Sequence, residues 1–336
     1  MNSLILQKQE EVIALAQFDI KDAVLKKCLL KEDETVITVP DGVTTIGKDA
    51  LCGLQSVIAV TLPESLKVIN DGAFYGCSSL TSVTLPGSVE RLGSCAFAQC
   101  SALNTIYLDN KLTEIGNSAF WGCTSLESID IPAGVTKIGY NLFGSCLSLI
   151  SVSLPDTVTE LDERAFKECT SLACITLPDS LIKIGNMAFL NCHNLKSVNI
   201  PDRLESIGEK AFFMCESLHE LEIPDGIASV GGDAFSDCVS VTVRSTISGK
   251  PLYKAVTATD GSSAYNFILR NIWDKGGFDF TAQDNYFPAL QDENLQYAIA
   301  FSRLMYRVNL SASAEEHYLD SVSYTHLRAH ETRGNL

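Results

Sequence analysis

Residues 80–100 read LTSVTLPGSVERLGSCAFAQC, and this stretch decides the fold because its pattern recurs every 23 residues. A phenylalanine stands three residues before each recurring cysteine, from Phe74 to Phe235. The cysteine column is Cys77, Cys100, Cys123, Cys146, Cys169, Cys192, Cys215 and Cys238. The proline column is Pro40, Pro63, Pro86, Pro132, Pro155, Pro178, Pro201 and Pro224, with Asp109 in the skipped phase. About nine units fit between Pro40 and residue 246, which indicates a repeat architecture.

The apolar columns predict one short strand and one short helical turn in each unit. Val83 and Leu85 alternate as in a strand with one buried face, and Pro86 ends that strand because it has no N–H to donate. Phe74 precedes Cys77 by three residues, which is the spacing of one inward-facing helical turn. We therefore expect every unit to be one coil with a strand and a helical turn.

Another column is almost always glycine. Its members are Gly47, Asn70, Gly93, Gly116, Gly139, Asp162, Gly185, Gly208 and Gly231. The exceptions are Asn and Asp, which are the other residues that tolerate a positive φ. The column therefore predicts a left-handed backbone at this point of each coil.

A single coil cannot be stable alone, and this predicts stacking. Each unit offers about eight apolar side chains, and burial of each contributes roughly 1.5–3 kcal/mol. Ordering the 23 residues costs on the order of 1–2 kcal/mol per residue, which one unit cannot balance. Stacked units share their apolar faces. The predicted fold class is an α/β repeat solenoid of about nine coils, with a small α-helical region after it.

The strand pattern Leu-x-x-Val-x-Leu resembles a leucine-rich repeat, and the whole unit, with its A-F-x-x-C and L-P marks, resembles the BspA-like leucine-rich repeat of bacterial proteins. The resemblance covers residues 36–246. It implies protein–protein contact and, in secreted members, adhesion to host surfaces. The usual asparagine three residues after the strand leucine is missing. In its place stand Ser65, Ser88, Lys111, Gly134, Thr157, Ser180, Arg203 and Gly226, which argues against a regular horseshoe curvature.

The pattern also divides the chain. We expect residues 1–39 to form an N-terminal helix and β cap, residues 40–246 the solenoid, and residues 247–263 a connector. Helical spacing over residues 264–321 predicts a truncated helical region. Residues 322–332 match the translation of a transposon-end sequencing adapter, so residues 322–336 are expected to be a non-native tail.

Composition excludes several classes of protein. The chain has 41 Asp and Glu against 25 Lys and Arg, a net charge of −16, which repels nucleic acid. No apolar run approaches the roughly 18 residues that span a bilayer. The first residues lack the basic start of a secretory signal, and the twelve cysteines then indicate reduced thiols in the cytoplasm. The alternative is a secreted or surface protein whose export signal lies upstream.

The sequence predicts no catalytic, cofactor or metal site, and no enzyme. A cysteine column places one thiol per coil in a line, whereas zinc needs four converging ligands. Buried structural thiols are therefore the favoured interpretation. Residues 42–48 imitate a phosphate-binding loop, but Asp49 stands where Ser or Thr is required. Cys174 falls on an outward strand position and is expected to be the most reactive thiol.

The remaining candidate for function is the surface. The outward position after Phe120 holds Trp121, and exposed aromatic residues often anchor interfaces. The outward strand positions include a small, hydroxyl-rich column that suits an extended partner laid across several coils: Thr84, Tyr107, Asp130, Ser153, Thr176, Asn199 and Glu222. Equally, these side chains are those of any soluble strand.

We therefore expect a non-enzymatic scaffold that binds a protein or peptide. The alternatives are an adhesin, or a targeting module for an activity in a lost C-terminal region. The sequence specifies neither the partner nor the oligomeric state.

Overall fold

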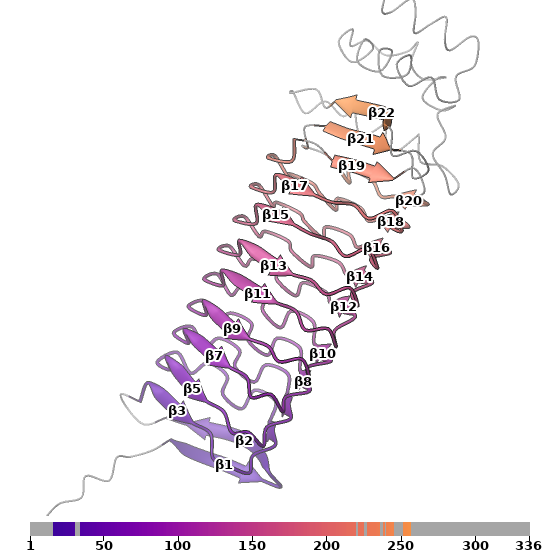
Figure 1. Ribbon diagram of the computed structural model, residues 1–336. Coiled ribbons are helices and arrows are strands. Elements are labelled where there is room, and N and C mark those ends of the chain that lie inside the picture. Colours follow the sequence, from indigo (N-terminus) through magenta and orange to yellow (C-terminus); the bar gives the residue numbers. More distant parts are fainter. Residues whose placement is uncertain are drawn as a thin grey trace, which may run out of the picture.

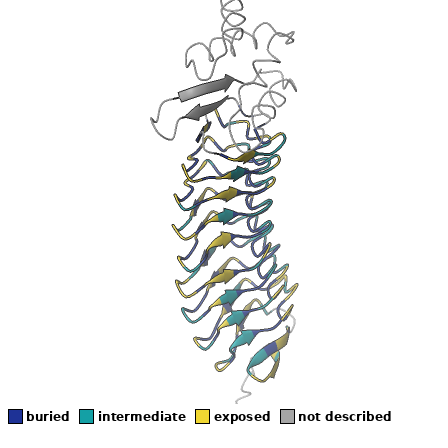
Figure 2. Ribbon diagram, turned by 90° about the vertical axis from the view of Figure 1, so that its right-hand side faces the viewer, coloured by how far each residue is buried: buried dark blue, intermediate teal, exposed yellow. Residues whose placement is uncertain are grey.

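The computed structural model describes residues 16–30, 34–219, 221–224, 227–235, 238, 240–244 and 251–256. They form a repeat solenoid of about nine coils stacked along a nearly straight axis (Figure 1). Each coil passes through a first strand, a second strand and a series of turns. Buried and exposed residues alternate around every coil (Figure 2). The expected repeat solenoid is confirmed.

Two sets of parallel strands, one per coil, run up the stack, with partners 23 residues apart. The first sheet face consists of β3 (Val36–Thr38), β5 (Ala59–Thr61), β7 (Ser82–Thr84), β9 (Thr105–Tyr107), β11 (Ser128–Asp130), β13 (Ser151–Ser153), β15 (Cys174–Ile175), β17 (Ser197–Val198) and β19 (Leu221–Pro224). The second sheet face consists of β4 (Thr45–Ile46), β6 (Val68–Ile69), β8 (Arg91–Leu92), β10 (Glu114–Ile115), β12 (Lys137–Ile138), β14 (Glu160–Leu161), β16 (Lys183–Ile184), β18 (Ser206–Ile207) and β20 (Ser229–Val230). The third side of each coil, which contains the phenylalanine and cysteine columns, is called the turn side.

Antiparallel strands stand at both ends of the described stack. At the start, β1 (Gln17–Lys21) and β2 (Val24–Leu29) form a hairpin, and β2 pairs in parallel with β4. At the other end, β21 (Ser240–Arg244) pairs in parallel with β19 and antiparallel with β22 (Pro251–Val256). Residues 1–15 of the predicted N-terminal helix and β cap lie outside the described residues, and the predicted helical region over residues 264–321 lies entirely outside them.

Both sheets are interrupted at one level of the stack, and the first sheet face is interrupted again between β13 and β15 and between β17 and β19. Within the described residues, no strand ladder joins β9 to β11 or β10 to β12. The preceding coil is the one in which Asp109 takes the place of proline. The turn side crosses this seam without a break, since Phe120 N donates to Leu142 O at 3.1 Å and Ser118 N to Tyr140 O at 2.8 Å. The turn side therefore joins the two blocks of coils.

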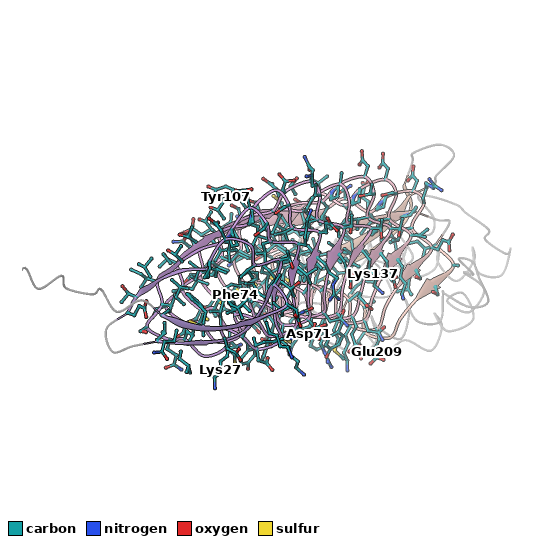
Figure 3. The ribbon with its side chains drawn as sticks, turned by 90° about the horizontal axis from the view of Figure 1, so that it is seen from below. Lys27, Asp71, Phe74, Tyr107, Lys137 and Glu209 are labelled. Carbon is teal, nitrogen blue, oxygen red and sulfur yellow. The ribbon has the colours of Figure 1, made fainter. Side chains whose placement is uncertain are left out.

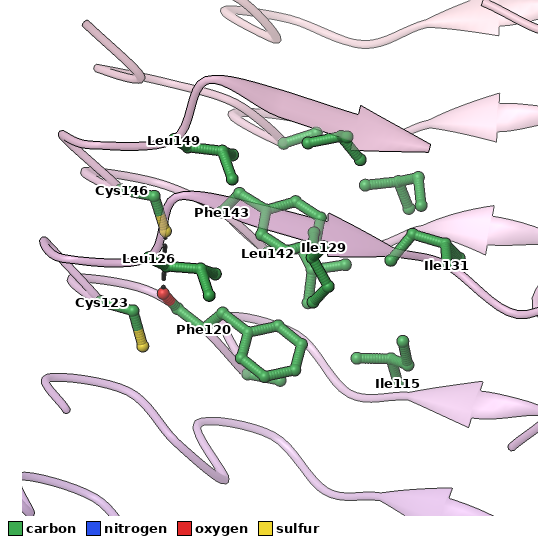
Figure 4. Packing of buried hydrophobic residues seen from close by; sticks show 14 of the residues in the cluster. Ile115, Phe120, Cys123, Leu126, Ile129, Ile131, Leu142, Phe143, Cys146 and Leu149 are labelled. Atoms are coloured by element: carbon green, nitrogen blue, oxygen red, sulfur yellow. Dashed lines mark hydrogen bonds between the residues drawn. The ribbon is translucent and has the colours of Figure 1, made fainter. Parts of the chain in front are cut away.

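The core is a continuous stack of phenylalanine rings. The eight rings from Phe74 to Phe235 are at most 1% exposed. Successive ring centroids are 4.9–6.0 Å apart, and the ring planes differ by 4–15°. Stacked aromatic pairs contribute about 0.5–1.5 kcal/mol beyond the burial of their area. Phe120 and Phe143 show this packing beside Leu126 and Ile129 (Figure 4). Each coil thus completes the burial of its neighbours.

The expected helical turn is wrong, because the described residues contain no helix. Consecutive turns occupy this segment, and every second amide is committed to the neighbouring coil. Cys77 N donates back to Phe74 O at 3.2 Å, but Phe74 N donates to Ala96 O of the next coil at 2.8 Å. An α-helix uses all its interior amides within itself, so it cannot make this second kind of bond.

The expectation of positive φ in the glycine column is also wrong. Positive φ falls two residues later, for example at Cys95 (54°) and Ser118 (56°), and not at the column itself. Glycine is needed there because the preceding coil lies too close for a side chain. A Cβ on Gly116 would lie 2.3 Å from Ser94 N, well inside contact distance.

Serine and threonine stand at several of the positions where a leucine-rich repeat usually has asparagine, and their hydroxyl groups form hydrogen bonds. Ser65 Oγ donates to Val43 O at 2.8 Å, and Thr157 Oγ1 donates to Val135 O at 2.8 Å. Each bond joins a side chain to the backbone of the preceding coil. A short ladder of hydroxyls therefore ties successive coils together along this edge.

We predict that Gly116→Ala destabilises the protein by several kcal/mol, in the range of an overpacked or strained core, because the backbone of the preceding coil must move. The matched control is Gly53→Ala. Gly53 has a φ of 72°, but no atom lies within 4 Å of the position that an added Cβ would take, so this change costs only about 1–2 kcal/mol of backbone strain. Urea unfolding measures the free energy of unfolding of both variants. Equal losses would contradict the close-approach explanation.

Candidate interaction surface

The first sheet face presents one outward side chain at each end of its three-residue strands. In β7, β11 and β13 the order is exposed, buried, exposed, with Val83, Ile129 and Val152 pointing into the core. The outward side chains are mostly serine and threonine. The strands are in register across the face, so their outward side chains form two straight columns.

The structure places seven of the eight predicted surface residues in one exposed column of this face. They are Thr84, Tyr107, Asp130, Ser153, Thr176, Asn199 and Glu222. Tyr107 is the most prominent, since 66% of its surface is exposed (Figure 3). Trp121 is different, because it follows Phe120 on the turn side and is half-buried. It does not belong to the first sheet face.

The Asn199 side chain is occupied by the protein itself. Its Oδ1 accepts from Leu177 N at 2.7 Å, and its Nδ2 donates to Leu177 O at 2.8 Å. These two bonds join consecutive coils where β15 and β17 are only two residues long. Asn199 therefore stabilises the stack, and the part of the column left open to a partner lies closer to the N-terminus.

The second sheet face neutralises its own charge. Residues of alternating sign stand above one another at 23-residue intervals in Arg91, Glu114, Lys137, Glu160 and Lys183. Neighbours in this column form ion pairs, among them Arg91 with Glu114 at 3.9 Å and Lys137 with Glu160 at 3.2 Å. The hydrogen bond from Lys183, together with Lys137, holds the pKa of Glu160 below its usual value.

On the turn side, some charged residues form ion pairs within single coils. Arg164 lies 3.4 Å from Glu163, and Lys167 lies 3.1 Å from Glu168. Lys210 and Glu209 form a further pair at 3.6 Å.

The proline column directly follows the strands of the first sheet face, and the turn that contains it is called the proline edge. Several acidic residues on the first sheet face and on its proline edge form no ion pair. No ion pair is formed by Glu127, Asp130, Asp156 or Asp179 in the part of the chain that the structure describes, and all four are exposed. A contact of 3.7 Å between His193 and Glu216 lies on the connections that precede the strands of this face. Of the four unpaired carboxylates, Glu127 and Asp130 lie on the first sheet face, and the other two lie on its proline edge. Among the described residues, exposed carboxylates without an ion pair also occur on the turn side, at Asp49, Asp71 and Asp233.

A shallow hollow of ≈ 510 Å³ lies on the second sheet face over β16, β18 and β20. Its lining includes Ser206 and Ser229, which continue the charged column, and the neighbouring glycines Gly208 and Gly231. The described residues contain no group of three or more His, Cys, Asp or Glu that could hold a metal ion, there or elsewhere. They also include no helix of the length and apolar character that a membrane crossing requires.

Comparison with known proteins identifies the family to which the repeat belongs. The family model described as BspA type leucine rich repeat region matches residues 19–150 and 136–250. The chain belongs to this family. The BspA-type pattern explains the shared L-P and A-F-x-x-C columns of the coils described above, and it confirms the resemblance in the sequence. No curated protein matches the chain significantly.

Solved structures similar to this BspA-type chain include bacterial leucine-rich repeat proteins. A leucine-rich repeat protein from Bacteroides ovatus is 30% identical over 70% of this chain and 65% of its own length, with a TM-score of 0.64. A leucine-rich repeat protein of T. pallidum is 30% identical, covers 61% of this chain and 88% of its own, and has a TM-score of 0.47. The chain spans 65% of the B. ovatus protein, so similarity alone does not transfer the role of that whole protein to this chain.

The cysteine column of this BspA-type chain consists of buried thiols that donate hydrogen bonds. Each Sγ donates to a carbonyl oxygen 26 residues earlier at 3.0–3.3 Å, and from Cys100 onward that oxygen belongs to a phenylalanine. Figure 4 shows the bond from Cys146 to Phe120. Burial raises the pKa of Cys123 to about 12. Cys174, in contrast, is exposed.

Sequence reasoning missed the neutralised column of the second sheet face. The signal was present, because Arg91, Glu114, Lys137, Glu160 and Lys183 alternate in sign at the repeat period. The apolar columns alone do not show this alternation, which distinguishes the two sheet faces already in the sequence.

The buried thiols predict that the free energy of unfolding falls as the pH rises above about 9. The unfolded thiol ionises near pH 9 and the folded Cys123 thiol near 12, so stability is complete below pH 9 and is lost as the pH rises toward 12. At pH 10 this amounts to about 1 kcal/mol for one such thiol. Urea unfolding under reducing conditions should show a smaller fall for Cys123→Ala than for wild type. Cys174→Ala, the exposed control, should keep the wild-type fall, and equal slopes in all three proteins would contradict the prediction.

Proposed function

We propose that this protein is a non-enzymatic scaffold whose first sheet face binds an extended segment of a protein partner. The observation that supports the proposal most strongly is the contrast between the sides of the coil. Ion pairs join many of the charged residues on the second sheet face and the turn side, whereas the first sheet face has an unpaired carboxylate, Asp130, beside an exposed tyrosine, Tyr107. Exposed aromatic residues with unpaired charges are typical of interaction surfaces.

The dimensions of this face suit an extended segment. Coils about 4.8 Å apart give a stack of nine a length of roughly 40 Å. An extended chain of about twelve residues covers that length, at roughly 3.3 Å per residue. The coils are held by backbone bonds and a stacked core, so the surface is ordered before the partner arrives. A preorganised surface loses less conformational entropy on binding.

The cytoplasmic location and the exclusion of nucleic acid stay predictions, as do the adhesin and the tethered-activity alternatives. The adhesin alternative predicts an export signal encoded upstream of Met1. The tethered-activity alternative predicts a domain of catalytic type beyond residue 320. Sequencing of the complete gene distinguishes both from the scaffold.

Affinity capture from a lysate of the native bacterium tests the scaffold. The blocking variant carries Thr84→Arg and Ser153→Arg on the first sheet face. The matched control carries Thr136→Arg and Ile182→Arg on exposed positions of the second sheet face, and it adds the same charge. Circular dichroism confirms that both are folded. We expect the blocking variant to capture at least about tenfold less of each partner than the wild type, and the control to capture the same amount as the wild type. Equal capture by the two variants, or no captured partner at all, would contradict the proposal.

A further inference from the structure

The turn side shows how this solenoid holds an arginine. Tyr140 and Glu163 stand 23 residues apart on consecutive coils, which are joined by the bond from Asn141 N to Glu163 O at 2.9 Å. The guanidinium carbon of Arg164 lies 5.7 Å from the centroid of the Tyr140 ring. Its Nη1 donates to the Tyr140 hydroxyl at 2.6 Å and lies 3.4 Å from Glu163 Oε1. A tyrosine and a carboxylate in one column thus bind a guanidinium together.

The first sheet face repeats the tyrosine and the carboxylate without the arginine. Tyr107 and Asp130 are also 23 residues apart, at the ends of β9 and β11, which are neighbours in the stack (Figure 1). Both side chains point outward and are exposed. In the described part of the chain no cation pairs with Asp130 or lies over the Tyr107 ring. The pair also spans the seam where the strand ladder between consecutive coils is interrupted.

We propose that Tyr107 and Asp130 receive an arginine side chain of an extended segment of the partner. This inference rests on the proposed function and names the residue that the partner supplies. A guanidinium can stack on the tyrosine ring while its N–H groups donate to the carboxylate, and its planar shape permits both contacts at once. Lysine offers only a point charge. The exposed carboxylates of Asp156 and Asp179 on the proline edge of this face attract a cationic segment toward it.

The rest of the segment is expected to be uncharged or mildly basic. The side chains around the pair are small and hydroxyl-bearing, among them Thr84, Thr105, Ser128 and Ser153, and they offer hydrogen bonds without steric obstruction. An acidic segment would meet the unpaired carboxylates and be repelled.

Selection of peptides tests this inference. A phage-displayed library of random dodecapeptides is selected against the full chain, and the affinities of the enriched peptides are measured by fluorescence anisotropy. We expect one enriched arginine position. Its replacement by citrulline, which has the same shape without the charge, should weaken binding to the wild type about tenfold or more, and replacement by lysine should weaken it less.

Variants of the protein locate the contact. The double variant Tyr107→Thr with Asp130→Ser should bind the arginine peptide about tenfold less tightly and should no longer distinguish arginine from citrulline. Tyr107→Phe, which keeps the ring, should retain most of that discrimination. The matched control is Tyr75→Thr with Asp41→Ser, which removes an exposed tyrosine and an exposed aspartate away from this pair and should behave as wild type.

The outcomes separate this inference from the proposed function. Enriched peptides without arginine, displaced by the Thr84→Arg and Ser153→Arg variant, would overturn the arginine site and leave the scaffold standing. Arginine peptides that bind the double variant as tightly as the wild type would also overturn the site. Failure to enrich any peptide that depends on the first sheet face would overturn both proposals.

Discussion

Hydrogen bonds from the turn side of one coil to the next hold this molecule together. Alternate amides there donate across the stack, as Phe97 N does to Ala119 O at 2.8 Å, and the bonds continue through the seam at which both sheets are interrupted. They fix the spacing at which the phenylalanine rings stack and the cysteine thiols reach the preceding coil. The same spacing leaves no room for a Cβ at Gly116. The spacing between coils that these hydrogen bonds set therefore determines both the packing of the core and the need for glycine at position 116.

The period, the strands and the inward columns could be predicted from the sequence because the buried positions of every coil are occupied by apolar residues. The conformation of the turn side could not. Three-residue spacing, as between Phe74 and Cys77, fits a helical turn and a chain of tight turns equally well, and only the direction of the amide bonds distinguishes them. Glycine at position 116 likewise fits positive φ or close approach. The roles of Asn199 and of the Tyr140 cluster depend on contacts between coils, which a single unit does not reveal.

The three sides of the coil have different roles. The turn side joins the coils, and the second sheet face balances its charges through the column that includes Lys137 and Glu160. The first sheet face remains available, with unpaired carboxylates and one prominent tyrosine. Regular stacking makes a surface of this kind possible, because it repeats an outward position at fixed intervals and lets each residue type be varied without disturbing the core. The family membership and the charge distribution are the grounds for the scaffold role that we propose.

Deletion of one complete unit tests most directly whether each coil is stabilised by its neighbours. Removal of residues 147–169 joins Cys146 to Thr170 and restores the pattern, whereas removal of residues 147–157 alone leaves half a coil. Urea unfolding of the first protein should remain a single cooperative transition at a lower midpoint, since one coil's interfaces are lost while the stack is closed again. The second protein should show no cooperative transition. If both deletions abolished cooperative unfolding equally, the stacked-coil account would be contradicted.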